Sequence, residues 1–279
     1  MDGSRNFTTK VPYIARDPLY KEEKLYSCDF NLGDSVIRNN HRYDWASVNV
    51  TAITDPKAFD LDTHGFCVLN AKTFVSPEKA IAEKPTIEDA YGKEVETLLH
   101  HHFPQYTRFE VMNIIVRKRD ERYPSPEDFS VVSHEQPARV PHCDFSLSGL
   151  PLQTEASFPD QWENLKDKDF DVLNLWRPLN SPNDDWPLAI ADFTSIHEGD
   201  VILNDDLHRD RAVENSLLHF NPGHRWYYLP SQTIEDILVF RTVDSTGKRP
   251  YAFHCAVNSP FSKPGELRSS IEARVYAIR

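Results

Sequence analysis

The stretch Val140-Pro141-His142-Cys143-Asp144-Phe145 places a histidine and an aspartate two positions apart in a mainly apolar run. In an extended strand, residues i and i+2 point to the same face, so the two side chains would enter the same space. A histidine from another strand would complete a facial triad of two histidines and one carboxylate. Such a triad binds non-haem Fe(II) and leaves coordination positions open. The stretch therefore predicts an iron site in a β-rich domain.

His254 is the preferred third ligand because it lies in a late apolar run, residues 251–257, which is typical of a strand. His219 and His224 compete for this role, but the Asn-Pro-Gly sequence between them is typical of a turn. A second His-x-Asp sequence, residues 208–210, lies in a charged run that is typical of a solvent-exposed segment. The predicted metal ligands and catalytic residues are therefore His142, Asp144 and His254.

After residue 45 the sequence predicts one early helix and then a series of short strands. The helix is expected over residues 86–102, and the three successive histidines at its end indicate an exposed terminus rather than a metal site. The run at 186–192 is expected to pair with the run at 171–179 across a turn. This order favours a mainly β fold with supporting helices, a β-sandwich or jelly roll. Strands are predicted at 43–54, 59–69, 109–117, 171–179, 186–192, 198–203, 225–229, 236–240, 251–257 and 271–278.

The length and composition limit the class of protein. A single domain is ordinary for 279 β-rich residues, and residues 1–45, polar and rich in turns, are expected to form an N-terminal arm over its surface. The formal net charge of -12 argues against a nucleic-acid partner. There is no apolar run long enough for a membrane span, no signal-peptide core and no Cys-x-x-Cys pair. We therefore expect a cytoplasmic protein that works without a membrane; the sequence does not predict its oligomeric state.

Two arginines beyond His254 are candidates for binding a dicarboxylate co-substrate. 2-Oxoglutarate chelates iron through its 2-oxo acid end, and its far carboxylate requires a cation, for which a forked guanidinium is best suited. Arg268 and Ser270 form an Arg-x-Ser sequence whose side chains share one strand face. Arg274 lies on the same predicted face and is the alternative clamp. The alternation of side chains does not decide between the two arginines.

Six further residues are candidates for the substrate pocket, although each is of a type that also packs in protein cores. The main alternative function is a jelly-roll protein that binds a metal or ligand without turnover of 2-oxoglutarate. Loss of a triad residue or of the arginine clamp would favour it, and the sequence retains both. A third possibility is an Fe(II) oxygenase that uses no 2-oxoglutarate. The pocket candidates are Arg117, Asn174, Arg177, Trp226, Tyr227 and Tyr228.

Seven longer segments extend these predictions over most of the chain after the arm. They are FDLDTHGF at 59–66, YGKEVETLL at 91–99, VPHCDFS at 140–146, NLWRPLNSPNDDWPLAIAD at 174–192, HRWYYLPSQTIEDILVFRTVDS at 224–245, AFHCAV at 252–257 and RSSIEARVYAI at 268–278. Through them the chain resembles the fungal asaB hydroxylase/desaturase family, which includes gibberellin-desaturase-like and CmcJ-like oxygenases of secondary metabolism.

The resemblance implies a double-stranded β-helix of the cupin type and a non-haem dioxygenase that depends on Fe(II), 2-oxoglutarate and O2. It supports His142, Asp144 and His254 as the iron ligands. It also implies that an Fe(IV)-oxo species hydroxylates, desaturates or cyclises a small-molecule substrate, an intermediate of natural-product biosynthesis. The identity of that substrate and the choice among the three reactions are not predicted.

Overall fold

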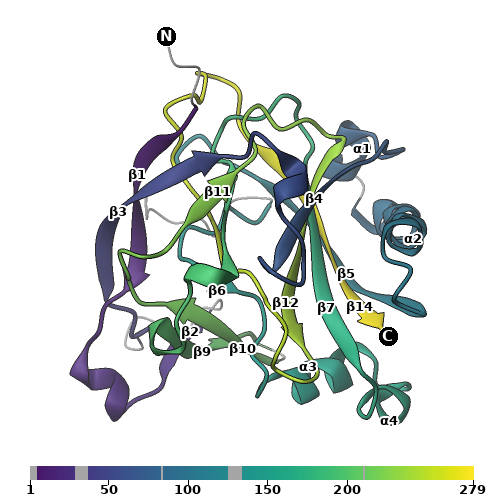
Figure 1. Cartoon of the computed structure of the whole chain (residues 1–279), viewed down its shortest axis with the longest axis horizontal. Helices are drawn as coiled ribbons and strands as arrows, with labels where there is room; N and C mark the ends of the chain where they lie inside the picture. The colour runs from purple at the N-terminus through teal and green to yellow at the C-terminus, as the bar shows by residue number, and fades with distance from the viewer. Residues whose placement is uncertain (1–4, 29–36, 83, 125–133, 210) are drawn as a thin grey trace.

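Two β-sheets facing one another form the body of the molecule (Figure 1). The computed structural model describes residues 5–28, 37–82, 84–124, 134–209 and 211–279. The arrangement is a double-stranded β-helix, which confirms the mainly β fold with supporting helices.

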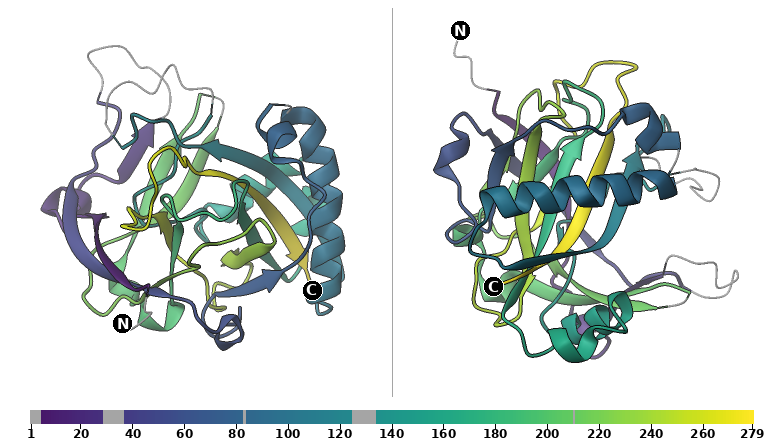
Figure 2. Two further views of the ribbon diagram at one scale, coloured as in Figure 1. Left: turned by 90° about the horizontal axis from the view of Figure 1, so that it is seen from above. Right: turned by 90° about the vertical axis from the view of Figure 1, so that its right-hand side faces the viewer.

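The five-stranded sheet contains the most deeply buried strands of the chain. Its order is β4-β12-β7-β14-β5, and all of its neighbouring strands are antiparallel. Helix α2 (Lys84–His102) lies across its outer face (Figure 2), and the opposite face looks toward the second sheet. The strands are β4 (Phe66–Asn70), β5 (Arg108–Lys118), β7 (Phe170–Pro178), β12 (Asp236–Asp244) and β14 (Ser269–Ile278).

The nine-stranded sheet, in the order β1-β3-β11-β8-β13-β6-β10-β9-β2, carries the predicted metal ligands. It curls so strongly that Ile14 at the end of β1 bridges His219, one residue beyond β10. The curl encloses an apolar cluster on one face of the sheet. The strands are β1 (Phe7–Ile14), β2 (Leu25–Cys28), β3 (Tyr43–Ala52), β6 (His142–Cys143), β8 (Leu188–Ala191), β9 (Val201–Leu207), β10 (Ala212–Leu218), β11 (Trp226–Tyr228) and β13 (His254–Ala256).

The N-terminal residues are not the surface arm that the sequence predicts. Residues 7–14 form β1, in which Val11, Tyr13 and Ile14 are at most 1% exposed, and residues 25–28 form β2. Pro12 obscures the first strand, because proline lacks the N–H that a central strand donates, but an edge strand tolerates it. The arm prediction is therefore wrong for these two segments. Residues 1–4 and 29–36 lie outside the described residues.

Strands β7 and β8 both form but do not pair with each other. β7 lies between β12 and β14, whereas β8 lies between β11 and β13 in the other sheet. The connection crosses between the sheets, where the Asn183 N–H donates to the Gln232 carbonyl at 2.9 Å. Because a jelly roll places successive strands in opposite sheets, the predicted pairing is wrong.

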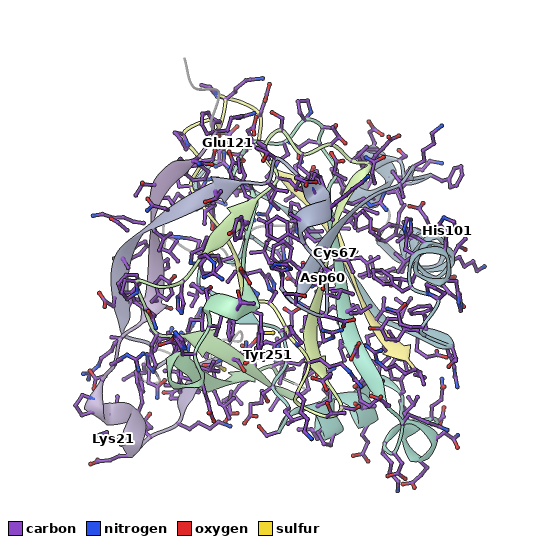
Figure 3. The ribbon with its side chains drawn as sticks, in the orientation of Figure 1. Lys21, Asp60, Cys67, His101, Glu121 and Tyr251 are labelled. Atoms are coloured by element: carbon purple, nitrogen blue, oxygen red, sulfur yellow. The ribbon has the colours of Figure 1, made fainter. Side chains whose placement is uncertain are left out.

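The helices support the sheets from outside. Among the described residues, no helix is long and apolar enough to cross a membrane. The histidines that end α2 are exposed, as predicted, and His101 lies on the outer side of that helix (Figure 3). The remaining helices are α1 (Pro77–Ala82), α3 (Leu150–Ser157) and α4 (Trp162–Leu165), with short 3-10 segments at Pro18–Lys21, Pro56–Ala58, Phe193–Ser195 and Glu198–Asp200.

Gly65, at the entrance to β4, packs directly against the segment that leads into β13. Its φ is +80°, and a Cβ atom there would lie 2.6 Å from the backbone carbonyl carbon of Tyr251. Its carbonyl accepts a hydrogen bond from the Arg241 N–H at 2.9 Å. Both the backbone conformation and the close approach therefore require glycine. This junction fixes the start of the strand that carries His254.

Candidate active site

The two predicted histidine ligands lie on neighbouring strands. His142 in β6 is directly opposite His254 in β13, and their ring centroids are 4.2 Å apart. Asp144 follows β6 immediately and points to the same side as His142. Cys143, between them, packs on the other side of the sheet with Cys255. The predicted alternation therefore brings the three side chains together.

The donor atoms form one compact group. His142 Nε2 lies 3.7 Å and His254 Nε2 lies 3.9 Å from Asp144 Oδ1, and one donor atom from each residue lies within 4.8 Å of the others. Atoms bound to one octahedral ion at about 2.1 Å lie roughly 3 Å apart, so shifts of about 1 Å would suffice for coordination. His142 Nδ1 contacts the Val140 carbonyl at 2.8 Å, which leaves Nε2 for a metal. Two imidazoles and one carboxylate suit Fe(II).

The electrostatic environment keeps all three groups in the form that binds a metal. Burial lowers the pKa of both histidines, that of His254 to about 3, so both rings are neutral near pH 7. Burial acts to raise the pKa of Asp144, but the charge of Arg274 and the two nearby histidines outweigh it and hold that pKa below its usual value. Asp144 is therefore an ionised carboxylate.

Arg274 and Asn174 hold the Asp144 carboxylate in place. The pairing of β14 with β7 sets these two residues opposite one another. Arg274 donates from Nε to Asp144 Oδ2 at 3.1 Å and from Nη2 to Oδ1 at 2.9 Å. Asn174 Nδ2 donates to Oδ2 at 3.0 Å. Three hydrogen bonds therefore orient the carboxylate, and Arg274 lies at the metal site.

Arg268 lies in a different environment from Arg274. It is 2% exposed, its Nη1 donates to the Trp186 carbonyl at 2.6 Å, and its guanidinium carbon lies 5.1 Å from the centroid of the Trp176 ring. Its Nε has no hydrogen-bond partner, and among the described residues no carboxylate pairs with its guanidinium. Burial lowers the pKa of Arg268 to about 10. A buried cation without a counter-ion is costly, so this environment suits a carboxylate ligand.

A cavity of about 420 Å³ opens beside His142 and Asp144. Most of the residues that line it are polar, and Arg274 is among them. His254 does not line it; that ring is buried against Phe240 at 4.5 Å between centroids. Arg268 and Ser270 do not line it either, and Ser270 is buried beside the β5 strand. The opposite wall comes from β9 and β10 and includes Asn204, Asp206, Val213, Asn215 and Leu217.

The pocket candidates Arg117, Asn174 and Arg177 do not all face the site, because side chains alternate between the two faces of a strand. Arg117 lines the cavity and pairs with Glu135 at 3.0 Å. Asn174 contacts Asp144. Arg177 points to the opposite face of β7, where it pairs with Glu94 of α2 at 3.5 Å. The structure therefore does not bring Arg177 into the site.

The three aromatic candidates on β11 lie outside the cavity. Trp226 and Tyr228 belong to the apolar cluster inside the curled sheet, and Trp226 Nε1 donates to the Tyr13 hydroxyl at 2.8 Å. Tyr227 faces the other way and packs against Phe59 at 4.8 Å between centroids. Trp226 and Tyr228 are therefore core residues, and Tyr227 is a partly buried residue that packs against the core.

The competing histidines have other partners. His219 Nδ1 contacts the Ile14 carbonyl at 2.8 Å, and His224 stacks on Tyr13. His208 is partly exposed, lines the cavity and lies 3.3 Å from Asp206. Asp210, its partner in the second His-x-Asp sequence, lies outside the described residues.

Glu272 is a site residue that no motif in the sequence identifies. It is 5% exposed and lies between two arginines, 3.4 Å from Arg117 and 3.3 Å from Arg274. It shares the inward face of β14 with Arg268 and Arg274, so the same i+2 spacing could have identified it. Glu272 links the base of the cavity to its β5 wall.

Comparisons with known proteins agree with this geometry. A family model described as "YDMC: Oxidoreductase/YMDC permease-like domain" matches residues 11–278. The Fe(II)/2-oxoglutarate-dependent dioxygenase nvfI of Aspergillus novofumigatus is 28% identical, over 98% of each chain. The hydroxylase/desaturase CTB9 of Cercospora beticola is 26% identical, over 92% of this chain and 88% of its own.

A solved structure has the same fold along its whole length. The iron and alpha-ketoglutarate-dependent endoperoxidase NvfI superimposes with a TM-score of 0.83 at 23% identity, covering 98% of both chains. The family match spans nearly the whole chain, and the His-Asp-His group stands where the sequence predicts it. The chain therefore belongs to the fungal hydroxylase/desaturase family of Fe(II)/2-oxoglutarate-dependent dioxygenases, which comprises the asaB-like and gibberellin-desaturase-like enzymes of secondary metabolism.

Proposed function

We propose that this chain binds Fe(II) through His142, Asp144 and His254 and uses 2-oxoglutarate and O2 to oxidise a small natural-product intermediate. The observation that carries the proposal is the compact His-Asp-His group, two of whose members, His142 and Asp144, line a cavity. The relatives named as a dioxygenase and a hydroxylase/desaturase support hydroxylation, desaturation or oxidative cyclisation as the reaction.

When bound, the iron and 2-oxoglutarate supply the activation of O2 that the protein's own side chains cannot perform. The chain's contribution is to present two neutral imidazoles and one ionised carboxylate on a rigid pair of strands. Arg274 and Asn174 prevent Asp144 from rotating away, and the cavity holds the substrate next to the open side of the triad. Orientation of ligands by such outer contacts is the usual way in which a protein tunes a metal site.

We assign the far carboxylate of 2-oxoglutarate to Arg268 and not to Arg274. Arg274 already directs two donors at both oxygens of Asp144, whereas Arg268 is a buried guanidinium with a free Nε and no carboxylate partner among the described residues. Ser270 shares its strand face and offers a hydroxyl. Because Arg268 does not line the cavity, the assignment requires side chains between Arg268 and the cavity to move when the co-substrate enters.

The first test is to add Fe(II) and 2-oxoglutarate to the anaerobic protein and record the visible charge-transfer band of the chelate. We expect the band in the wild-type protein and its loss in His142→Ala and in His254→Ala, each checked for folding by circular dichroism. A well-folded wild-type protein without the band would refute the proposal and favour the alternative of a jelly-roll binding protein. Turnover that survives Arg268→Ala together with Arg274→Ala would instead indicate an Fe(II) oxygenase that needs no 2-oxoglutarate.

A further inference from the structure

Arg139 stands at the wall of the cavity only three residues before the metal ligand His142. Its position is fixed from both sides, because the Ala138 carbonyl accepts a hydrogen bond from the Ala256 N–H at 2.6 Å and the Val140 carbonyl contacts the His142 ring. The backbone of this residue is therefore tied to the two strands that carry the histidine ligands.

Two indole rings support the Arg139 guanidinium. Its central carbon lies 4.9 Å from the centroid of Trp45 and 5.9 Å from that of Trp186. Trp186 is buried, whereas Trp45 is 49% exposed, which is unusual for the largest apolar side chain. Stacking on aromatic faces restricts a guanidinium while its N–H groups stay available at the edges. The cation is therefore pre-organised for a ligand.

Arg139 also has no acidic partner in the part of the chain that the structure describes. Its Nη1 donates to the Pro124 carbonyl at 3.2 Å, and among the described residues no carboxylate forms an ion pair with it. By contrast, Arg117 in the same cavity pairs with Glu135 and Glu272, and Arg274 pairs with Asp144. In a chain with a net charge of -12, an arginine at the active-site wall that pairs with no carboxylate of the described residues is a specific feature. Its natural counterpart is an anion from outside the protein.

The rim beside Arg139 is aromatic. His41 lines the cavity, and its Nδ1 lies 3.2 Å from the hydroxyl of Tyr43, which is 43% exposed. Tyr43 and Trp45 share one face of β3. Tyr43 and Trp45 do not line the cavity itself, so they offer flat apolar surface next to it, to a ring system whose charged end reaches Arg139.

We propose that Arg139 and Trp45 form a subsite for a carboxylate on the substrate, so that the enzyme selects an organic acid with a ring-containing apolar body. The inference rests on the proposed function, because it places the substrate in the cavity beside the iron ligands. A guanidinium binds a carboxylate through two parallel hydrogen bonds, and a neutral ester or amide cannot replace that charge.

The test uses isothermal titration calorimetry with 2-naphthoate and its neutral analogue 2-naphthamide as probes. We expect the wild-type protein to bind the acid at least about tenfold more tightly, a difference of about 1.4 kcal/mol. The preference should vanish in Arg139→Gln, persist in part in Arg139→Lys, and remain in Arg108→Gln, which alters a half-exposed arginine on the other sheet. Trp45→Ala should weaken binding of both probes and reduce the preference.

Equal or undetectable binding of the two probes by the wild-type protein would overturn the proposal, as would an acid preference that survives Arg139→Gln. The chelate band of Fe(II) and 2-oxoglutarate separates the two possible carboxylates. We expect Arg139→Gln to keep the wild-type affinity for 2-oxoglutarate, and a loss of that affinity would show that Arg139 serves the co-substrate instead. Because the calorimetry needs neither iron nor turnover, its outcome is independent of the test of the proposed function.

Discussion

Arg268 and Arg274 have side chains on the same side of the β14 segment, yet we expect them to have different functions. Under the proposed function, Arg274 orients the Asp144 carboxylate, and Arg268 binds 2-oxoglutarate. Exchanging Arg274 for Gln removes two of the three hydrogen bonds to Asp144, so we expect Fe(II) affinity to fall by about ten- to a hundredfold. Arg268→Gln should leave Fe(II) affinity unchanged and weaken 2-oxoglutarate binding. Competition with a chromophoric chelator measures the first affinity, and the chelate band measures the second. The reverse pattern would exchange the two roles.

His254 should make the metal-free protein sensitive to acid. Its pKa is about 3 in the folded protein, whereas an unfolded histidine titrates near 6.5. As the pH falls below 6.5, the unfolded chain takes up a proton that the folded chain does not, so the free energy of unfolding decreases. The loss for this residue is about 2 kcal/mol at pH 5.

Urea denaturation at pH 7.5, 6 and 5 measures this effect. His254→Gln should flatten the pH dependence, whereas His101→Gln, an exposed position at the end of α2, should leave it as in the wild-type protein. An unchanged slope in His254→Gln would mean that the ring does not stay neutral when buried.

At the scale of elements, the turn before β4 sets the position of β13, the strand that carries His254. We expect Gly65→Ala to cost about 2 kcal/mol or more, because it combines a positive φ with a contact of 2.6 Å to the Tyr251 backbone. Gly199→Ala is the matched control, since a Cβ there meets nothing within 4 Å, and we expect a cost of about 0.5 kcal/mol or less. Thermal unfolding gives both costs. Fe(II) titration should also detect weaker binding in the first variant, because His254 lies three residues beyond Tyr251.

Alternation in a short strand depends on local geometry alone, so the sequence was sufficient to place His142 and Asp144 on one face. His254 comes from a distant strand, and its choice rested on the apolar run around it. The sequence was insufficient for Arg177, because all nine residues of β7 are buried and a strand covered on both faces shows no polar alternation to reveal its inner side. The choice between the arginines likewise needed the register of β14 against β7, which sets Arg274 opposite Asn174. Strand pairing between distant segments is a property of the whole fold, so the β7–β8 pairing was also beyond local pattern.

For the whole molecule, closure of the curled sheet depends on its first strand. Deleting residues 1–14 would remove Val11, Tyr13 and Ile14 from the core and leave the Trp226 N–H without its partner. We therefore expect the truncated protein to lose its cooperative thermal transition or to aggregate. If the truncated protein kept the wild-type melting temperature, the prediction would be wrong. Residues 1–14 would then be better described as a surface arm.

The placement of Cys143 and Cys255 affects how easily their thiols are oxidised during turnover. Each thiol is next in sequence to a proposed metal ligand, yet both pack on the far side of the sheet and are fully buried. Burial raises the pKa of both thiols, so they stay protonated and are poor nucleophiles toward oxidants. The backbone of β6 and β13 thus shields easily oxidised sulfur from reactive oxygen generated one residue away. We expect peptide mass spectrometry after repeated turnover to find oxidation at the less buried Cys28 before either of these two.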